Sequence, residues 1–238
     1  MIVEDRLTCF KSYDVRGRVP EELNPDVAYR VGRAVVEFLH PRKVVVGRDI
    51  RSSSLELSEA FKNGVIDGGA DVLDIGLCGT EMVYFATSFL DAQCGVMITA
   101  SHNPPEYNGM KFVREQSRPI SGDSGLFEIE RLAVQNSFSP SPQKGTQQSV
   151  NIMDDYVQYI LKQIRVEKLK PVKIVSNPGN GGAGLVIDQL QKFLPFEIVK
   201  VHHEPDSTFP HGIPNPLLPE NRFSTSEAVI RSHAAIGI

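Results

Sequence analysis

Residues 95–111 read GVMITASHNPPEYNGMK. The run begins with apolar residues, several of them β-branched, which is typical of a buried strand. From Thr99 onward it is polar and is punctuated by proline and glycine, which is typical of a loop. The stretch therefore predicts a buried strand that ends in a loop, where the hydroxyl of Ser101 and the imidazole of His102 are neighbours in the chain.

This loop is expected to have a defined shape. Asn103 precedes a proline, so the helical conformation is disfavoured for it, and Asn108-Gly109 is a turn signal that returns Lys111 toward the strand. Ligands of a parallel α/β sheet bind beyond the carboxyl ends of its strands, so Ser101 is a candidate nucleophile. A lone serine after a strand is more often a cap or a turn residue.

Strand and helix patterns alternate before this stretch. Residues 44–46 and 71–76 are apolar strand patterns, and helical spacing follows Asn24 and Ser53, where Glu56 completes a capping box with Ser53. The alternation predicts a largely parallel sheet with right-handed crossovers. The predicted fold class is α/β, with two consecutive α/β three-layer units whose sheets are mixed but mainly parallel.

A Ser-, Pro- and Gln-rich segment divides the chain. Residues 137–150 have no periodicity and are typical of a linker, so we expect one domain over 1–136 and another over 151–238. The second domain has a strand pattern over 172–176. It ends in an apolar strand pattern at 234–238, so this unit is expected to be truncated at its last strand.

Composition restricts the function classes. The 238 residues suffice for one large or two ordinary domains, and 41% hydrophobic with 23% charged residues is ordinary for a soluble protein. A net charge of -4 argues against bulk nucleic-acid binding, and no run approaches the roughly 18 apolar residues of a membrane helix. The N-terminus has no apolar signal core, and the three cysteines adjoin apolar runs. We therefore expect a cytoplasmic protein with buried thiols, no membrane and no nucleic acid.

Two further patterns suggest other sites. Gly179, Gly181 and Gly184 match the dinucleotide fingerprint after a strand, which leaves nicotinamide binding as an alternative, although the fingerprint alone is weak. His202, His203, Asp206 and His211 form a His-rich cluster among several prolines. Their spacing matches no metal site, so a surface loop is the expected structure.

The stretch around Ser101 resembles a known family. Thr-Ala-Ser-His-Asn-Pro followed by Tyr-Asn-Gly-x-Lys is similar to the phosphoserine loop of the α-D-phosphohexomutases, the phosphomannomutase/phosphoglucomutase family. Residues 13–17, Tyr-Asp-Val-Arg-Gly, are similar to the family's Tyr-Asp-Ile-Arg-Gly with one conservative change. Residues 177–184 resemble its Asn-Pro-x-Asn-Gly-x-x-Gly turn. The resemblance covers essentially the whole chain, about the first half of the family's length, and bacterial phosphomannomutases resemble it most.

The resemblance implies a reaction and a set of site residues. A phosphoserine enzyme would interconvert mannose 1-phosphate and mannose 6-phosphate through a hexose 1,6-bisphosphate, with GDP-mannose synthesis as the pathway. Phosphoglucomutase activity and a non-catalytic phosphosugar-binding module are the alternatives. The implied catalytic residues are Ser101, Lys111 and His102, and the implied substrate- and phosphate-binding residues are Tyr13, Arg16 and Asn103. Arg48 and Arg51 either assist a phosphate or pair with Asp49, and the ion pair is favoured.

The resemblance also implies cofactors. Mg²⁺ is expected at the phosphate of Ser101, and a hexose 1,6-bisphosphate is expected as activator. The family's Asp-Gly-Asp-x-Asp metal loop has no counterpart, since no Asp-x-Asp occurs in residues 1–238. The fragment alone is therefore expected to be inactive, with a hexose phosphate as the partner of the whole enzyme. The sequence leaves the oligomeric state open.

Overall fold

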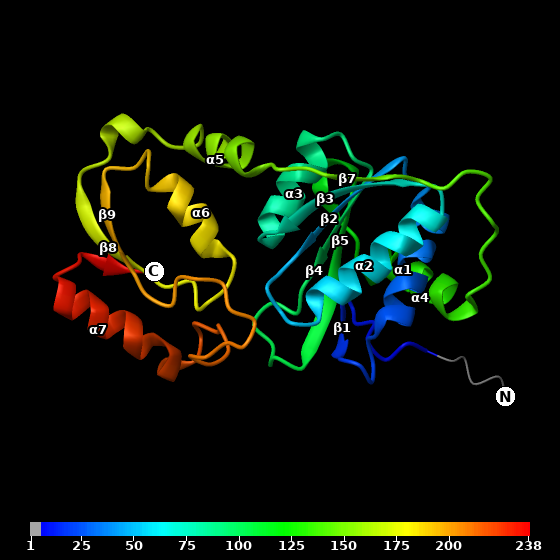
Figure 1. The fold of residues 1–238 in the computed structure, drawn as a ribbon, viewed down its shortest axis with the longest axis horizontal. Helices are drawn as coiled ribbons and strands as arrows, with labels where there is room; N and C mark the ends of the chain where they lie inside the picture. The colour runs from blue at the N-terminus through cyan, green and yellow to red at the C-terminus, as the bar shows by residue number, and fades with distance from the viewer. Residues whose placement is uncertain (1–5) are drawn as a thin grey trace. The chain divides into compact units, whose positions relative to one another are not determined.

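The structure is a computed structural model that describes residues 6–238 (Figure 1). Contacts divide the chain into two compact units. Unit 1 runs to Ser101 and resumes over 106–151, and unit 2 consists of residues 102–105 and 152–238. Both units combine helices with mainly parallel strands, so the predicted α/β class is confirmed.

Unit 1 is built on one mixed sheet. Over the described residues, this sheet has the order β1-β5-β4-β2-β3-β7, and β6 pairs with β5. The strands β4, β2, β3 and β7 are parallel, whereas β1, β5 and β6 are joined by antiparallel pairing. The elements are β1 (Val15–Arg18), α1 (Pro25–Leu39), β2 (Lys43–Arg48), α2 (Ser54–Asp67), β3 (Asp71–Leu77), α3 (Thr80–Phe89), β4 (Cys94–Ile98), β5 (Tyr107–Arg114), β6 (Arg118–Pro119), α4 (Leu126–Gln135) and β7 (Gln147–Ser149).

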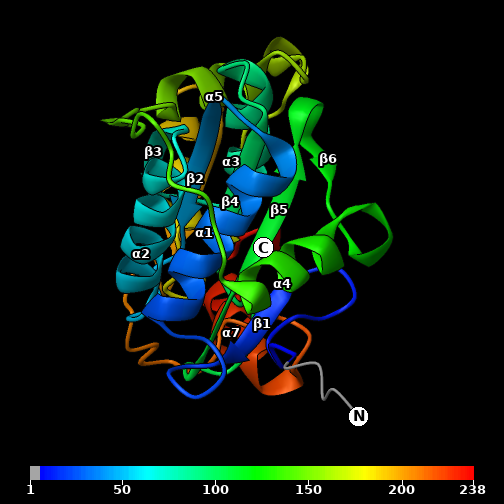
Figure 2. The same cartoon turned by 90° about the vertical axis from the view of Figure 1, so that its right-hand side faces the viewer.

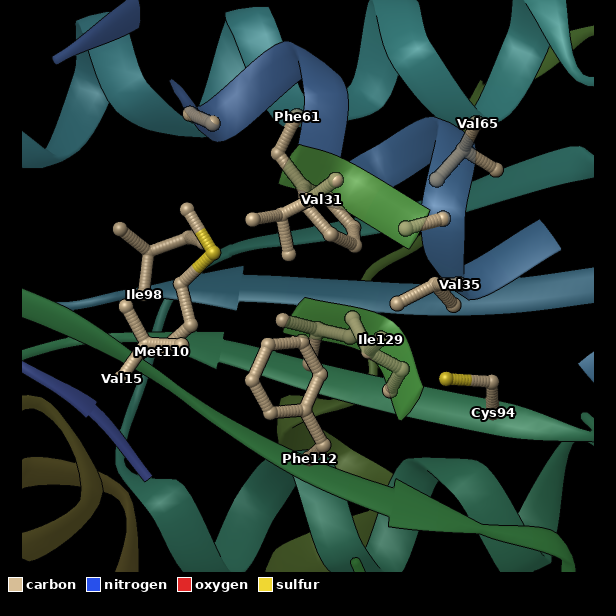
Figure 3. Packing of buried hydrophobic residues seen from close by; sticks show 14 of the residues in the cluster. Val15, Val31, Val35, Phe61, Val65, Cys94, Ile98, Met110, Phe112 and Ile129 are labelled. Carbon is tan, nitrogen blue, oxygen red and sulfur yellow. The ribbon is translucent and has the colours of Figure 1, made fainter. Parts of the chain in front are cut away.

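The core of unit 1 lies between this sheet and three helices. Figure 2 shows α1, α2 and α4 over one face of the sheet. Val31 of α1, Phe61 of α2 and Ile129 of α4 meet Ile98 and Phe112 of the strands there (Figure 3). Helix α3 packs on β2, β4 and β5. Its buried residues cover the face of the sheet opposite to α1, α2 and α4. Unit 1 therefore has the predicted three layers.

Two predictions for the helix starts have different outcomes. Asn24 caps α1, because its Oδ1 accepts a hydrogen bond from the backbone N–H of Val27 at 3.0 Å. The predicted capping box of Ser53 and Glu56 is wrong. Ser53 has helical backbone angles, and its Oγ accepts a hydrogen bond from Nδ2 of Asn108 at 2.8 Å. The buried Asn108 requires acceptors, so it takes the hydroxyl that a cap would use.

The segment predicted as a linker contains a strand. Residues 147–149 form β7, which pairs with β3 in parallel, and their side chains are exposed. The backbone of an edge strand forms its ladder regardless of side-chain polarity, and the hydroxyl of Thr146 also donates to Asp71 at 2.7 Å. Sequence periodicity therefore gave no signal for this strand.

Unit 2 contains a parallel sheet in the order β10-β8-β9 within the described part of the chain. The predicted strand over 172–176 is confirmed as β8, and β10 lies within the strand pattern at 234–238. Over residues 6–238 no helix combines the length and the apolar character that crossing a membrane demands. The elements are α5 (Met153–Leu161), β8 (Val172–Ser176), α6 (Ala183–Leu190), β9 (Phe196–Lys200), α7 (Phe223–Ser232) and β10 (Ile236–Gly237).

Candidate functional site

Ser101 follows the carboxyl end of β4 in a strained conformation. The pairing of β4 with β5 extends beyond Ile98, since Thr99 N–H donates to the carbonyl of Gly109 at 2.9 Å. Ser101 is exposed and has φ of 57°, in the left-handed region. That conformation costs a residue other than glycine roughly 1–3 kcal/mol, so the neighbouring structure must hold Ser101 in it.

Hydrogen bonds hold both backbone groups of Ser101. Its N–H donates to Oγ1 of Thr99 at 2.9 Å, and the Thr99 hydroxyl donates to Oδ2 of Asp49 at 2.6 Å. Its carbonyl accepts a hydrogen bond from Nη2 of Arg51 at 2.9 Å. The position of Ser101 is thus set by side chains from the ends of two neighbouring strands.

Arg51 binds both ends of the loop. Besides Ser101, its guanidinium donates from Nη1 to the carbonyl of Tyr107, the first residue of β5, at 3.0 Å. Arg51 is 2% exposed, and its Nε lies 3.3 Å from Oδ2 of Asp49, so the predicted ion pair is confirmed. Burial lowers the pKa of Arg51 from its ordinary value, and the charge of Asp49 opposes this shift. Arg48 donates to the carbonyl of Asp49 at 3.3 Å.

The predicted turn at Asn108-Gly109 is wrong, because both residues lie inside β5. Asn108 is buried, and its Oδ1 accepts the N–H of Gly109 at 2.8 Å. A Cβ on Gly109 would meet the carbonyl oxygens of Val15 and Thr99. The glycine is therefore required by the close approach of β1 and of the segment after β4.

Arg16 and Lys111 share one carboxylate. In the antiparallel pairing of β1 with β5, Val15 is opposite Met110, and one step further places Asp14 opposite Lys111. Oδ2 of Asp14 lies 2.8 Å from Nη2 of Arg16 and 3.2 Å from Nζ of Lys111. The Asp14 side chain is 3% exposed, whereas those of Arg16 and Lys111 are 30% and 27% exposed. The two cations are therefore paired with a buried carboxylate and still reach solvent.

The electrostatics of this pair favour the charged arginine. The hydrogen bond to Asp14 is the main cause that raises the pKa of Arg16, burial opposes it, and a hydrogen bond with Tyr13 contributes further. Tyr13 is exposed and precedes Asp14. This edge of unit 1 can therefore present two positive charges to an anionic ligand.

The structure places the predicted site residues in two groups. Arg16 and Lys111 come together at Asp14, and Tyr13 and Ser101 belong to the same unit. His102 is exposed, Asn103 is half-buried, and both are grouped with unit 2. Sequence patterns assigned no role to three supporting residues, although they lie within the quoted motifs: Asp14, Thr99 and Asn108.

The His-rich segment is not one cluster. Nε2 of His203 lies 2.8 Å from Oδ1 of Asp188, while the ring of His202 stacks on His211 with centroids 3.6 Å apart. His203 is buried, so the predicted surface loop is wrong at this residue, which packs against α6. Within residues 6–238, no three His, Cys, Asp or Glu side chains form a group that could hold a metal ion.

The glycine-rich turn after β8 holds a neighbouring segment of chain. Asn180 has φ of 59°; its N–H donates to the carbonyl of His202 at 2.7 Å, and its Nδ2 donates to that of Glu204 at 2.8 Å. A Cβ on Gly184 would meet the carbonyl oxygen of His203. The hydrogen-bond donors of this turn, which a dinucleotide phosphate would need, thus bind the carbonyls of residues 202 and 204. This weakens the nicotinamide hypothesis.

Unit 2 also contains a cleft of about 750 Å³. Its walls include residues 177–179, 211–216, 220–226 and 237–238. Arg222 lies in this wall, but its guanidinium donates to the carbonyls of Pro216 and Leu217 at 2.7 and 2.8 Å. Its donors are thus partly used within the loop.

Family models match most of the chain. The model of phosphoglucomutase/phosphomannomutase α/β/α domain I matches residues 7–139, and that of domain II matches residues 154–238. The structure is also similar to a solved phosphoglucomutase/phosphomannomutase family protein from Burkholderia thailandensis. The TM-score is 0.87 at 33% identity, and the match covers 100% of this chain and 52% of that one.

Two bacterial relatives give the same result. The chain is 52% identical over 240 residues to a protein named phosphomannomutase from Escherichia coli K12, covering 98% of this chain and 53% of that protein. It is 51% identical over 232 residues to a protein named phosphohexose mutases from Xanthomonas campestris, covering 98% of this chain and 52% of that protein. The chain thus spans about half the length of these relatives.

Proposed function

The chain belongs to the phosphoglucomutase/phosphomannomutase family, and we propose that its protein is a phosphohexomutase whose phosphoryl carrier is Ser101. The proposed reaction interconverts mannose 1-phosphate and mannose 6-phosphate. The observation that carries the proposal is the exposed Ser101, held in a left-handed conformation by Arg51 and Thr99. The name of the Escherichia coli relative supports mannose phosphate as the substrate.

The proposed chemistry is two phosphoryl transfers. The Oγ–P bond of phosphorylated Ser101 breaks and a free hydroxyl of the hexose phosphate forms the new P–O bond, so that this hydroxyl loses a proton and the departing Oγ of Ser101 gains one. The resulting hexose 1,6-bisphosphate returns its other phosphoryl group to Ser101. Such transfer depends on positioning and on positive charge around the phosphoryl oxygens, which we assign to Lys111 and Arg16. Tyr13, His102 and Asn103 are proposed to contact the substrate.

Mg²⁺ is the proposed cofactor, with the phosphate of Ser101 as one ligand. The described residues contain no group of three or more His, Cys, Asp or Glu side chains that could hold a metal ion. The side chains of residues 6–238 therefore do not fit a complete Mg²⁺ site, and no step above is routed through the metal. A chelator titration of the full-length protein tests the requirement.

The proposal is tested by a mutase assay on the full-length protein that contains this chain. Mannose 1-phosphate and glucose 1-phosphate are compared by kcat/KM, with a hexose 1,6-bisphosphate as activator. Ser101→Ala is expected to reduce turnover to background, while Ser137→Ala, at an exposed serine in the 137–150 segment, keeps it. Turnover retained by Ser101→Ala would contradict the proposal. Since the 238-residue chain spans about half its relatives, we expect no turnover from it alone.

A further inference from the structure

We propose that Asp14 is a positioning residue that fixes Arg16 and Lys111 relative to each other for phosphoryl transfer. This inference rests on the proposed function, because it assigns a role to the two cations in that reaction. The Asp14 carboxylate is expected to act through Arg16 and Lys111 without touching the substrate.

The geometry requires Asp14 to serve both cations with one atom. Oδ2 accepts from Arg16 at 2.8 Å and from Lys111 at 3.2 Å. Arg16 is on β1 and Lys111 is on β5, so the carboxylate joins the side chains of two adjacent strands. Arg16 is opposite Gly109, so Arg16 and Lys111 are diagonal neighbours across this strand pair, and without the carboxylate between them their like charges would repel.

Burial makes this interaction stronger than a surface ion pair. The Asp14 side chain is 3% exposed. Solvent screening, which reduces the interaction energy of exposed ion pairs to near zero, is therefore weaker here. Each cation is about 30% exposed, so its far side remains available to an incoming anion. The arrangement resembles a preorganised electrostatic site, in which the charges are in place before the reaction.

The second oxygen of Asp14 indicates what the carboxylate is for. Oδ1 is buried, and among the described residues no hydrogen-bond donor reaches it. All the ion pairs that Asp14 makes within residues 6–238 therefore go to the two cations. A carboxylate that served mainly to complete the local backbone structure would be expected to use this oxygen as well.

The change that isolates this role is Asp14→Asn. The amide keeps the shape and one acceptor oxygen, and it removes the charge. We expect kcat of the full-length mutase to fall roughly 10- to 100-fold, with KM changed much less, because the cations remain present but are no longer fixed. The matched control is Glu130→Gln, since Glu130 is also buried and paired with an arginine, Arg6, at 3.2 Å. This control is expected to keep turnover.

A double-mutant cycle separates positioning from a merely structural role. If Asp14 acts through both cations, the part of its effect that passes through Lys111 disappears once Lys111→Gln has been made, and the part that passes through Arg16 remains. We expect the fall in kcat caused by Asp14→Asn to be at least about threefold smaller in the Lys111→Gln background than in the wild type. Thermal unfolding of every variant shows that folded protein is compared. If Asp14→Asn does not fold, Asp14→Ser, which also removes the charge, takes its place in the same cycle.

The outcomes distinguish the two proposals. Wild-type kcat in Asp14→Asn, or an undiminished loss in the Lys111→Gln background, overturns the role of Asp14 while the mutase function stands. Turnover retained by Ser101→Ala overturns the function, and the inference falls with it. Loss in Ser101→Ala together with a non-additive cycle supports both.

Discussion

The guanidinium of Arg51 donates to the carbonyl of Ser101 at 2.9 Å while it is itself almost fully buried. The same side chain donates to the carbonyl of Tyr107, so one rigid planar group binds both ends of the loop that carries the proposed nucleophile. A serine with a positive φ angle needs such support. We therefore expect the side chains that support Ser101, and not only the serine itself, to determine activity.

The first prediction concerns Arg51→Lys. An ammonium keeps the charge, but it cannot reproduce the planar fork that serves two carbonyls and Asp49 together. We expect a roughly 100-fold loss of mutase turnover and faster amide exchange across residues 101–107. Arg33→Lys is the control, because Arg33 also donates to a carbonyl, that of Ser139 at 2.9 Å. Unchanged turnover and unchanged exchange in Arg51→Lys would refute the supporting role.

The second prediction concerns the crossing of α1 and α2. A Cβ on Gly32 would meet the carbonyl oxygen of Phe61, and one on Gly64 would meet that of Tyr29. The two backbones are therefore in direct contact, and Gly32→Ala should lower the free energy of unfolding by about 1–3 kcal/mol. Urea denaturation measures this loss. Asn63→Ala, at an exposed position of α2, is expected to be neutral or slightly stabilising, and an equally mild effect of Gly32→Ala would exclude the close crossing.

The third prediction is a loss of stability at alkaline pH. Burial raises the pKa of Cys78 and of Cys94 from 9.0 to about 12, and that of Cys9 to about 11. Between pH 9 and these values the folded state keeps protons that the unfolded state releases, so stability falls as pH rises. At pH 10 this amounts to about 1 kcal/mol per buried thiol.

Urea unfolding at pH 8 and pH 10 tests this dependence. The midpoint is expected to fall with pH, and the decrease should be smaller in Cys94→Ala than in the wild type, whatever that variant's stability at pH 8. The same decrease in both proteins would mean that other groups cause it.

The sequence predicted the features that depend on side-chain periodicity. The alternation of strands and helices, the helix that starts after Asn24 and the strand over 172–176 follow from patterns within a few residues. The buried β4 followed by an exposed Ser101 belongs to the same class, because its signal is the change from apolar to polar residues at Thr99.

The features that the sequence did not predict depend on pairing between distant residues. Asn108 and Gly109 carry the composition of a turn, but the carbonyl of Val15, far away in the chain, requires a glycine inside β5. The role of Asp14 was not predicted for the same reason, because only the register of β1 against β5 places it beside Lys111. Residues 147–149 form a strand because β3 offers an unpaired edge, not because their own side chains favour one.

The most direct test of the account is the site of phosphorylation. Full-length protein is incubated with a hexose 1,6-bisphosphate labelled in its phosphates, and the labelled peptide is identified by mass spectrometry. The account predicts the label on Ser101 in the wild type and in Ser137→Ala, and no label in Ser101→Ala. A label on another residue, or labelling that persists in Ser101→Ala, would contradict it.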